Sequence, residues 1–260
     1  MHARPHEIRV VIEPGIEIAG TLCVPEGSLG LVLMAHPNAS ERRTARERLV
    51  ATVFEQAGFA TLSLDLLTPS EEQAERFGHD ARRPPPVLAP RVDPRRGKFR
   101  FDIPLLAGRM ILATSWLRRQ LETQALPIGY FGNNTAAAAA LVAAAHESDR
   151  VRAVVTRGGR VDLAGEELSD VRAPTLLVVG SADVPVMAAT RAVQPKLSCE
   201  TRLEVIPGAA HEFEQSGALE LVAFRARDWF LRHVPMAKVV ARDLTPVSRR
   251  ERAPVSAARH

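Results

Sequence analysis

Short apolar segments of strand length alternate with longer amphipathic segments along most of this chain, and this alternation restricts the fold more than any other feature. The segment "GLVLMAH" (residues 30–36) is continuously apolar, as strands are when helices cover both faces of their sheet. The next segment, residues 41–58, has helical spacing of its apolar residues Ala45, Leu49, Val53 and Ala57. The alternation predicts an α/β fold, a mainly parallel sheet with helices on both faces.

The same reasoning gives an expected order of elements. The first two strands form an antiparallel pair with a turn at Pro14-Gly15. Strands are expected at residues 7–13, 15–24, 30–36, 59–66, 126–132, 151–159, 173–183 and 201–211. Helices are expected at residues 41–58, 101–121, 136–145 and 218–234.

Composition excludes several classes of protein. The chain has 260 residues, 46% of them hydrophobic and 25% charged, which suits a globular domain. It contains no apolar run long enough to span a membrane, and its start, "MHARPHEIRVV", has no apolar signal core. Two cysteines, Cys23 and Cys199, over this length indicate reduced thiols, so we expect a cytoplasmic protein.

The formal net charge of +4 is concentrated at the end of the chain. Residues 237–260 contain six Lys or Arg and two acids, so the rest of the chain is formally neutral. A nucleic-acid-binding protein is expected to carry its basic face on the folded body, so we expect no specific nucleic-acid partner and no membrane partner. We predict a single domain at residues 1–235 and a disordered basic tail at 236–260. The Pro- and Arg-rich segment 77–97 is predicted to be a surface loop, either covering a site or a flexible excursion.

The stretch "GYFGNNTAAAAALVAAA" (129–145) has the layout of a nucleophile elbow, in which a strand turns sharply into a helix. The elbow pattern G-x-S-x-G is matched by Gly132, Asn133, Asn134, Thr135 and Ala136, which places Asn134 where the serine belongs. An elbow residue usually has positive φ, which Asn tolerates better than most residues.

Two further polar residues follow predicted strands in the order of a Ser-Asp-His triad. Asp183 comes after "LLVVGSAD" and His211 after "VIPGAAH". Both lie at carboxyl ends of strands, where open α/β sheets build their sites. The sequence therefore predicts a triad-like site made of Asn134, Asp183 and His211.

At this point the chain resembles the dienelactone hydrolase-like branch of the α/β-hydrolase family. The resemblance covers about residues 7–234 and rests on "LVLMAH", "FATLSLDLLTP", "FRFDIPLLAGR", "TRGGRVDLAG", "APTLLVVGSAD" and "LEVIPGAAHEFEQSGALE". It implies an α/β-hydrolase fold and ancestry among hydrolases of small esters or lactones, and we expect no cofactor. It also implies oxyanion donors from the backbone of Thr135 and, because Pro37 has no N–H, from Asn38 or Ala39.

Several departures from the family pattern fall on the chemical positions. A carboxamide is a very poor nucleophile, so Asn134 is not expected to form an acyl-enzyme. Ala136 stands where the second elbow glycine is expected. The oxyanion loop, which follows the third strand and is usually His-Gly followed by small residues, here is His36-Pro37-Asn38-Ala39-Ser40. Concerted change favours a protein retained for binding or interaction with a small ester- or lactone-like molecule. The alternative is an active hydrolase or lyase in which the His211-Asp183 pair activates water and Asn134 positions the substrate.

Three more residues are candidates for substrate binding. Arg157 and Arg160 flank two glycines at a strand end, where an arginine either binds a substrate carboxylate or pairs with a local acid such as Asp162. His36 ends a strand beside the oxyanion loop and is expected mainly to shape that loop. We expect no metal site, because "HEFE" lacks the second histidine of a zinc-binding helix and the other histidines are scattered.

Overall fold

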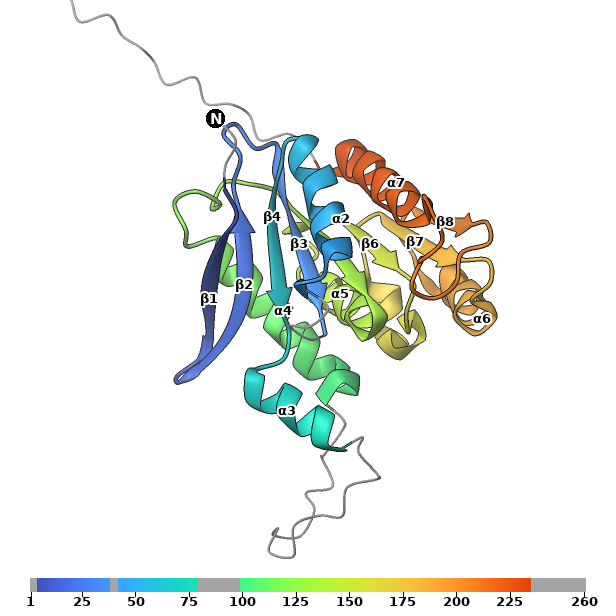
Figure 1. Cartoon of the computed structure of the whole chain (residues 1–260), viewed down its shortest axis with the longest axis horizontal. Coiled ribbons are helices and arrows are strands. Elements are labelled where there is room, and N and C mark those ends of the chain that lie inside the picture. The colour runs from blue at the N-terminus through green and yellow to red at the C-terminus, as the bar shows by residue number, and fades with distance from the viewer. Residues whose placement is uncertain (1–3, 38–41, 79–98, 235–260) are drawn as a thin grey trace, which may run out of the picture.

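The computed structural model describes residues 4–37, 42–78 and 99–234. The predicted disordered tail, the residues around Asn38 and most of the predicted 77–97 loop lie outside these ranges. The described chain forms one eight-stranded sheet with the order β1-β2-β4-β3-β5-β6-β7-β8 (Figure 1). Strands β3 to β8 run parallel to one another, and β1 and β2 form the antiparallel opening pair that the sequence predicted.

The strands lie close to their predicted positions. They are β1 His6–Glu13, β2 Ile16–Cys23, β3 Gly30–His36, β4 Phe59–Asp65, β5 Ile128–Asn133, β6 Val151–Arg157, β7 Thr175–Gly180 and β8 Thr201–Ile206. The central strands β3, β4, β5 and β7 are buried at every residue, as continuous apolar runs in a covered parallel sheet should be.

Four predicted helices are present and two were missed. The predicted ones are α2 Ala45–Gln56, α4 Ile103–Leu117, α5 Asn134–His146 and α7 Ala218–His233. The missed ones are α3 Pro69–Gly78 and α6 Val184–Val193, together with the 3-10 segments Phe99–Phe101, Val161–Asp170 and Gln194–Lys196. None of the described helices has the length and apolar character needed to cross a membrane.

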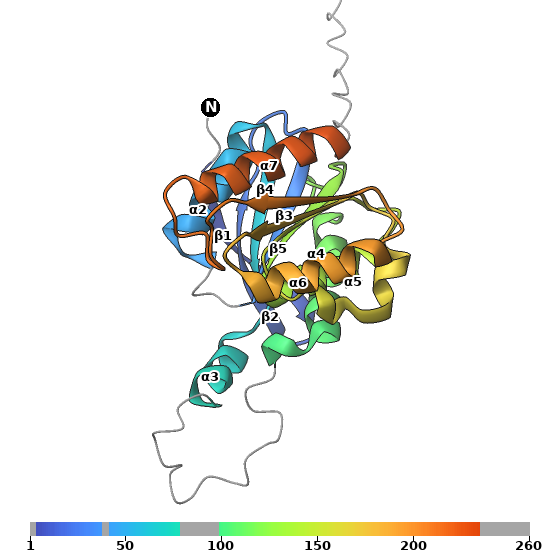
Figure 2. The same cartoon turned by 90° about the vertical axis from the view of Figure 1, so that its right-hand side faces the viewer.

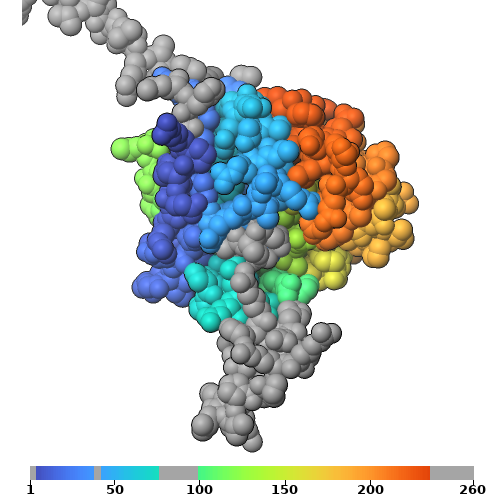
Figure 3. Space-filling model, in the orientation of Figure 1, coloured from blue at the N-terminus to red at the C-terminus, as the bar shows by residue number. Residues whose placement is uncertain are grey.

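Helices cover both faces of the sheet. Figure 2 shows α2 and α7 on one side of the strands and α4, α5 and α6 on the other. Strand β3 illustrates the division, because Val32 and Met34 pack with α2 and α7 whereas Leu31 and Leu33 pack with α4 and α5. Helices α2 and α7 also contact each other and lie side by side on the surface (Figure 3). The structure thus has the fold class predicted from the sequence.

Helix α2 corrects one detail of that prediction. Its buried residues are Glu47, Val50 and Phe54. The apolar residues from which the helix was predicted are only partly buried, and Ala45 is exposed. The ring of Phe54 instead makes edge-on contacts with Phe131 of β5 and Phe230 of α7, at centroid distances of 5.6 and 5.5 Å. The inward face of α2 therefore carries a glutamate, which becomes important at the site.

Candidate active site

The predicted elbow is present. Strand β5 ends at Asn133, helix α5 begins at Asn134, and Asn134 has φ of 49°, the positive value expected there. The turn is tight enough to require glycine on both sides. A Cβ on Gly132 would lie 2.5 Å from the carbonyl oxygen of Ala136, and a Cβ on Gly159 would lie 2.2 Å from that of Asn134. The sequence thus folds into an elbow that presents the amide of Asn134.

Asp183 and His211 meet at this elbow. Nδ1 of His211 lies 2.6 Å from Oδ2 of Asp183, and Nε2 of His211 lies 2.8 Å from Oδ1 of Asn134. The three side chains come from the carboxyl ends of β5, β7 and β8, as predicted from their order in the sequence. The side chain of His211 is 44% exposed and that of Asp183 only 10%. The arrangement has the geometry of a nucleophile–histidine–acid triad, with the amide of Asn134 beside Nε2 of His211.

The hydrogen bond between Asn134 and His211 has two chemically sensible forms. When Nδ1 donates to Asp183 and the ring is neutral, Nε2 has no proton and accepts from Nδ2 of Asn134 after a half-turn of the amide. When Nε2 carries a proton, it donates to Oδ1 of Asn134, the oxygen that lies 2.8 Å away. In both forms the amide of Asn134 is hydrogen bonded to Nε2 of His211.

The loop that carries His211 is held in a defined shape. Phe213 is buried and has φ of 53°, a strained value for a residue other than glycine, and such strain is often found at functional sites. The amide of Ala210 donates to the side chain of Gln215, and that of Gly208 donates to the hydroxyl of Ser181. The positive φ of Phe213 could not be predicted from the sequence, because an apolar residue gives no signal for left-handed backbone.

A buried polar cluster lies on α2 and at the ends of β3 and β6. Nη2 of Arg157 lies 2.6 Å from Oε1 of Glu47, and Nδ1 of the fully buried His36 lies 3.8 Å from Oε2 of Glu47. The pKa of His36 is lowered to about 4, mainly by burial; the charge of Glu47 opposes this shift, and the positive charges of Arg157 and Arg42 add to it. His36 is therefore neutral near pH 7. Burial raises the pKa of Glu47. The positive charge of Arg157 and its hydrogen bond to Glu47 have the opposite effect and are stronger, so the pKa lies below its ordinary value.

The remaining predicted site residues are less directly placed. Arg160 forms a two-pronged pair with Asp162, the local-acid interpretation, and its amide donates to the carbonyl of Asn134 at 3.1 Å. Thr135 is buried in the first turn of α5. Asn38 lies outside the described residues. Glu47 was not predicted as a site residue. It lies three residues before Val50 and seven before Phe54, so helical spacing places it on the same face as these two apolar residues, and this spacing could have indicated its burial.

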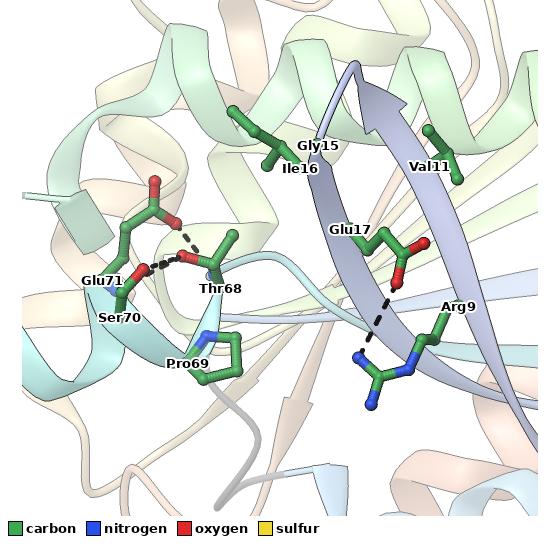
Figure 4. Close-up of a pocket in the computed structure, with 9 residues that line it drawn as sticks. All are labelled: Arg9, Val11, Gly15, Ile16, Glu17, Thr68, Pro69, Ser70 and Glu71. Carbon is green, nitrogen blue, oxygen red and sulfur yellow. Dashed lines mark hydrogen bonds and ion pairs between the residues drawn. The ribbon is translucent and has the colours of Figure 1, made fainter.

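Two other features of the structure bear on ligand binding. In the described parts of the chain, no group of three or more His, Cys, Asp or Glu side chains is arranged to hold a metal ion. A hollow of about 490 Å³ lies between the β1–β2 hairpin and the start of α3 (Figure 4). Its charged side chains are already paired, Arg9 with Glu17 and Glu71 with Arg109. It is therefore a weaker candidate for a ligand site than the elbow.

The fold and site together define an α/β-hydrolase: a parallel sheet, an elbow after β5, an acid after β7 and a histidine after β8. Comparison with solved structures agrees. The chain is 42% identical to dienelactone hydrolase from Anabaena variabilis ATCC 29413, covering 90% of this chain and all of that one, with a TM-score of 0.79. The chain belongs to the dienelactone hydrolase family. Est1E from Butyrivibrio proteoclasticus, only 15% identical, shares the fold with a TM-score of 0.64 over 87% of this chain and 98% of its own.

Two curated relatives from Mycobacterium tuberculosis have a different name. Proteins of strains H37Rv and CDC 1551, each named "Putative phosphoribosyl transferase", are 46% identical to this chain over 231 residues. The match covers 89% of this chain but 47% of theirs, so the chain spans about half the length of these relatives. No family model matches the chain.

Proposed function

We propose that this protein binds a small ester- or lactone-like molecule at the carboxyl ends of the strands without forming an acyl-enzyme. The observation that supports the proposal is the amide of Asn134, which occupies the nucleophile position 2.8 Å from Nε2 of His211. Amide nitrogen and oxygen are very poor nucleophiles, and the amide also occupies the nitrogen that would act as general base. The remaining elbow geometry favours retention of a binding site rather than of serine-esterase chemistry.

A second function is favoured by the His211–Asp183 pair. At 2.6 Å this pair is as close as in a working triad, and the side chain of His211 is 44% exposed, so water can reach it. In this alternative the amide of Asn134 moves from Nε2 to hold the substrate, and His211 removes a proton from water. The protein would then be a hydrolase or lyase that acts without a covalent intermediate.

The name of the mycobacterial relatives does not transfer to this proposal. The chain matches only 47% of their length, and its own site has the residues of an α/β-hydrolase. A hydrolase-type ligand, a small ester or lactone, is the substrate class that the site of this chain supports.

The test compares the native protein with Asn134→Ser on short-chain p-nitrophenyl esters and a panel of small lactones. We expect the native protein to be inert and the serine variant to gain turnover, because the introduced hydroxyl would meet an intact His211–Asp183 pair. The double variant Asn134→Ser with His211→Ala is the control and should lose the gained turnover. Turnover by the native protein that His211→Ala abolishes would instead establish the water-activating alternative.

A further inference from the structure

Glu47 and Arg157 form a buried ion pair between two segments that frame the elbow. Each side chain is only 5% exposed, and the two residues are 110 positions apart in the sequence. Glu47 lies in the first turn of α2, the helix that follows the oxyanion loop. Arg157 is the last residue of β6 and pairs in register with Asn133, the residue before the elbow asparagine.

The backbone that follows Arg157 encloses the elbow. Gly159 approaches Asn134 so closely that a Cβ would lie 2.2 Å from the Asn134 carbonyl oxygen, and the amide of Arg160 donates to that same oxygen. Any shift of the end of β6 would therefore move the elbow. A Cβ on Gly158 would lie 3.6 Å from the carbonyl oxygen of His211, so the same backbone also packs against the histidine loop. Because Glu47 of α2 holds this strand end, the ion pair connects both the elbow and the histidine loop to α2.

The ion pair is poorly built for stability alone. Removing two charges from water is costly, and replacing a buried pair with apolar side chains of similar size is often neutral or stabilising. Here the hydrogen bonding is also incomplete within the described ranges, since Oε2 of Glu47, Nη1 of Arg157 and both ring nitrogens of His36 are buried without a hydrogen-bond partner there. Because desolvation of the two charges is costly and their hydrogen bonding is incomplete, the ion pair is better explained by a role other than stabilising the fold.

We propose that Glu47 and Arg157 are positioning residues, whose ion pair sets the position of the side chain of residue 134 relative to Nε2 of His211. The inference rests on the proposed function, because it takes residue 134 as the nucleophile position. Arg157 then acts on the site through its neighbours, not through a contact with substrate. The ring of Phe131 on β5, with its centroid 5.8 Å from the guanidinium carbon, holds Arg157 from a second side.

The experiment replaces the pair with apolar side chains of similar size, Glu47→Leu with Arg157→Met, in the Asn134→Ser background. We expect a melting temperature equal to or above that of the parent, a kcat lowered by about tenfold to a hundredfold, and a KM changed by less than about twofold. This split follows because the alignment of residue 134 with Nε2 of His211 matters mainly in the transition state, where the proton moves to the histidine. Unchanged kcat in the folded double variant would overturn the proposal.

The matched control is a second Arg–Glu pair away from the elbow, Arg109 with Glu71, whose side chains are 6% and 18% exposed and which joins α4 to α3. Glu71→Leu with Arg109→Met should leave kcat and KM of the serine variant unchanged. If it lowers kcat as much as the Glu47 and Arg157 replacement does, the effect is a general loss of packing and the proposal is wrong. Single replacements at Glu47 or Arg157 leave one buried charge unpaired and are expected to lower the melting temperature sharply.

A second readout does not depend on turnover, so it separates failure of this inference from failure of the proposed function. In the native Asn134 chain, the ¹⁵N resonance of Nε2 in His211 reports its hydrogen bond to Asn134. The Glu47→Leu and Arg157→Met double variant should shift this resonance while the control double variant leaves it in place. If Asn134→Ser is inert but the shift is seen, the positioning role stands and the hydrolytic ancestry of the site is in doubt. A folded double variant with the native resonance would refute the positioning role.

Discussion

At the scale of single residues, the site depends on backbone conformations that few side chains tolerate. Asn134 and Phe213 both have left-handed φ values, on the two loops that bring the amide and the imidazole together. The positive φ at Asn134 was predicted from the elbow pattern, because the pattern itself specifies the turn. The positive φ at Phe213 was not predictable, because it results from the packing of the histidine loop. In that packing the Phe213 ring lies against Gly158, where an added Cβ would be 3.5 Å from the ring.

The close approach of Gly159 to the elbow gives a prediction at the same scale. Gly159→Ala should lower the free energy of unfolding by at least about 2 kcal/mol more than Gly27→Ala does. Both glycines have positive φ, so both variants incur backbone strain. Only at Gly159 would the new Cβ also meet backbone, the Asn134 carbonyl oxygen at 2.2 Å, whereas at Gly27 it would meet no described atom within 4 Å. Urea unfolding measures both, and equal losses would contradict the close approach.

At the scale of elements, helix existence was easier to predict than the buried face. Helix α2 contacts both the sheet and α7, so its buried side is set by two neighbours and not by its own apolar spacing. Glu47 is buried there because Arg157, far away in the sequence, supplies the opposite charge. Helix α6 was missed, although its start is signalled by Asp183 with Pro185 two residues later. Asp183 caps the helix by accepting a hydrogen bond from the amide of Val186. One residue thus serves as helix cap and as partner of His211.

The alanine-rich helix α5 gives a prediction at this scale. It packs against α4 and strands β3, β5 and β6, and Ala136 to Ala144 are buried. Ala143→Leu should lower the free energy of unfolding by about 1–3 kcal/mol, because three added carbon atoms have no space in a close-packed interface. Ala145→Leu, at a partly exposed position of the same helix, should change it by less than about 0.5 kcal/mol. Thermal unfolding compares the two, and a tolerated Ala143→Leu would mean that the interface is looser than described.

At the scale of the whole molecule, sequence order alone indicated which strand ends meet. The predicted triad residues follow strands that are parallel and near neighbours in the sheet, so their meeting at 2.6 and 2.8 Å follows from topology. Buried charges were not predictable in this way. Arg42 reaches Glu7 of β1 and Asp65 of β4, and Arg157 reaches Glu47 of α2, through pairings that depend on the three-dimensional packing of side chains.

One of these buried groups gives the whole molecule a pH dependence. His36 has a folded-state pKa of about 4, below its ordinary value of 6.5, because burial disfavours its charged form. Between these two values the unfolded chain binds a proton that the folded chain does not, so acidification favours unfolding, and above pH 6.5 the effect vanishes. Relative to His36→Gln, the native protein should therefore lose about 2 kcal/mol of unfolding free energy between about pH 7 and about pH 5.

The measurement is urea unfolding of the native protein and His36→Gln at about pH 7, 6 and 5. The charged groups around the ring, Glu47, Arg157 and Arg42, are the same in both proteins, so the difference between the two curves isolates the titration of His36. The control for loss of a histidine is His146→Gln. His146 is the last residue of α5, and its side chain is 56% exposed. If the free energies of unfolding of the native protein and His36→Gln change in parallel with pH, the imidazole takes up its proton in the folded state. That uptake requires water or a second acid beside the imidazole. The closed polar cluster between α2 and the ends of β3 and β6 would then have to be more open than its burial indicates.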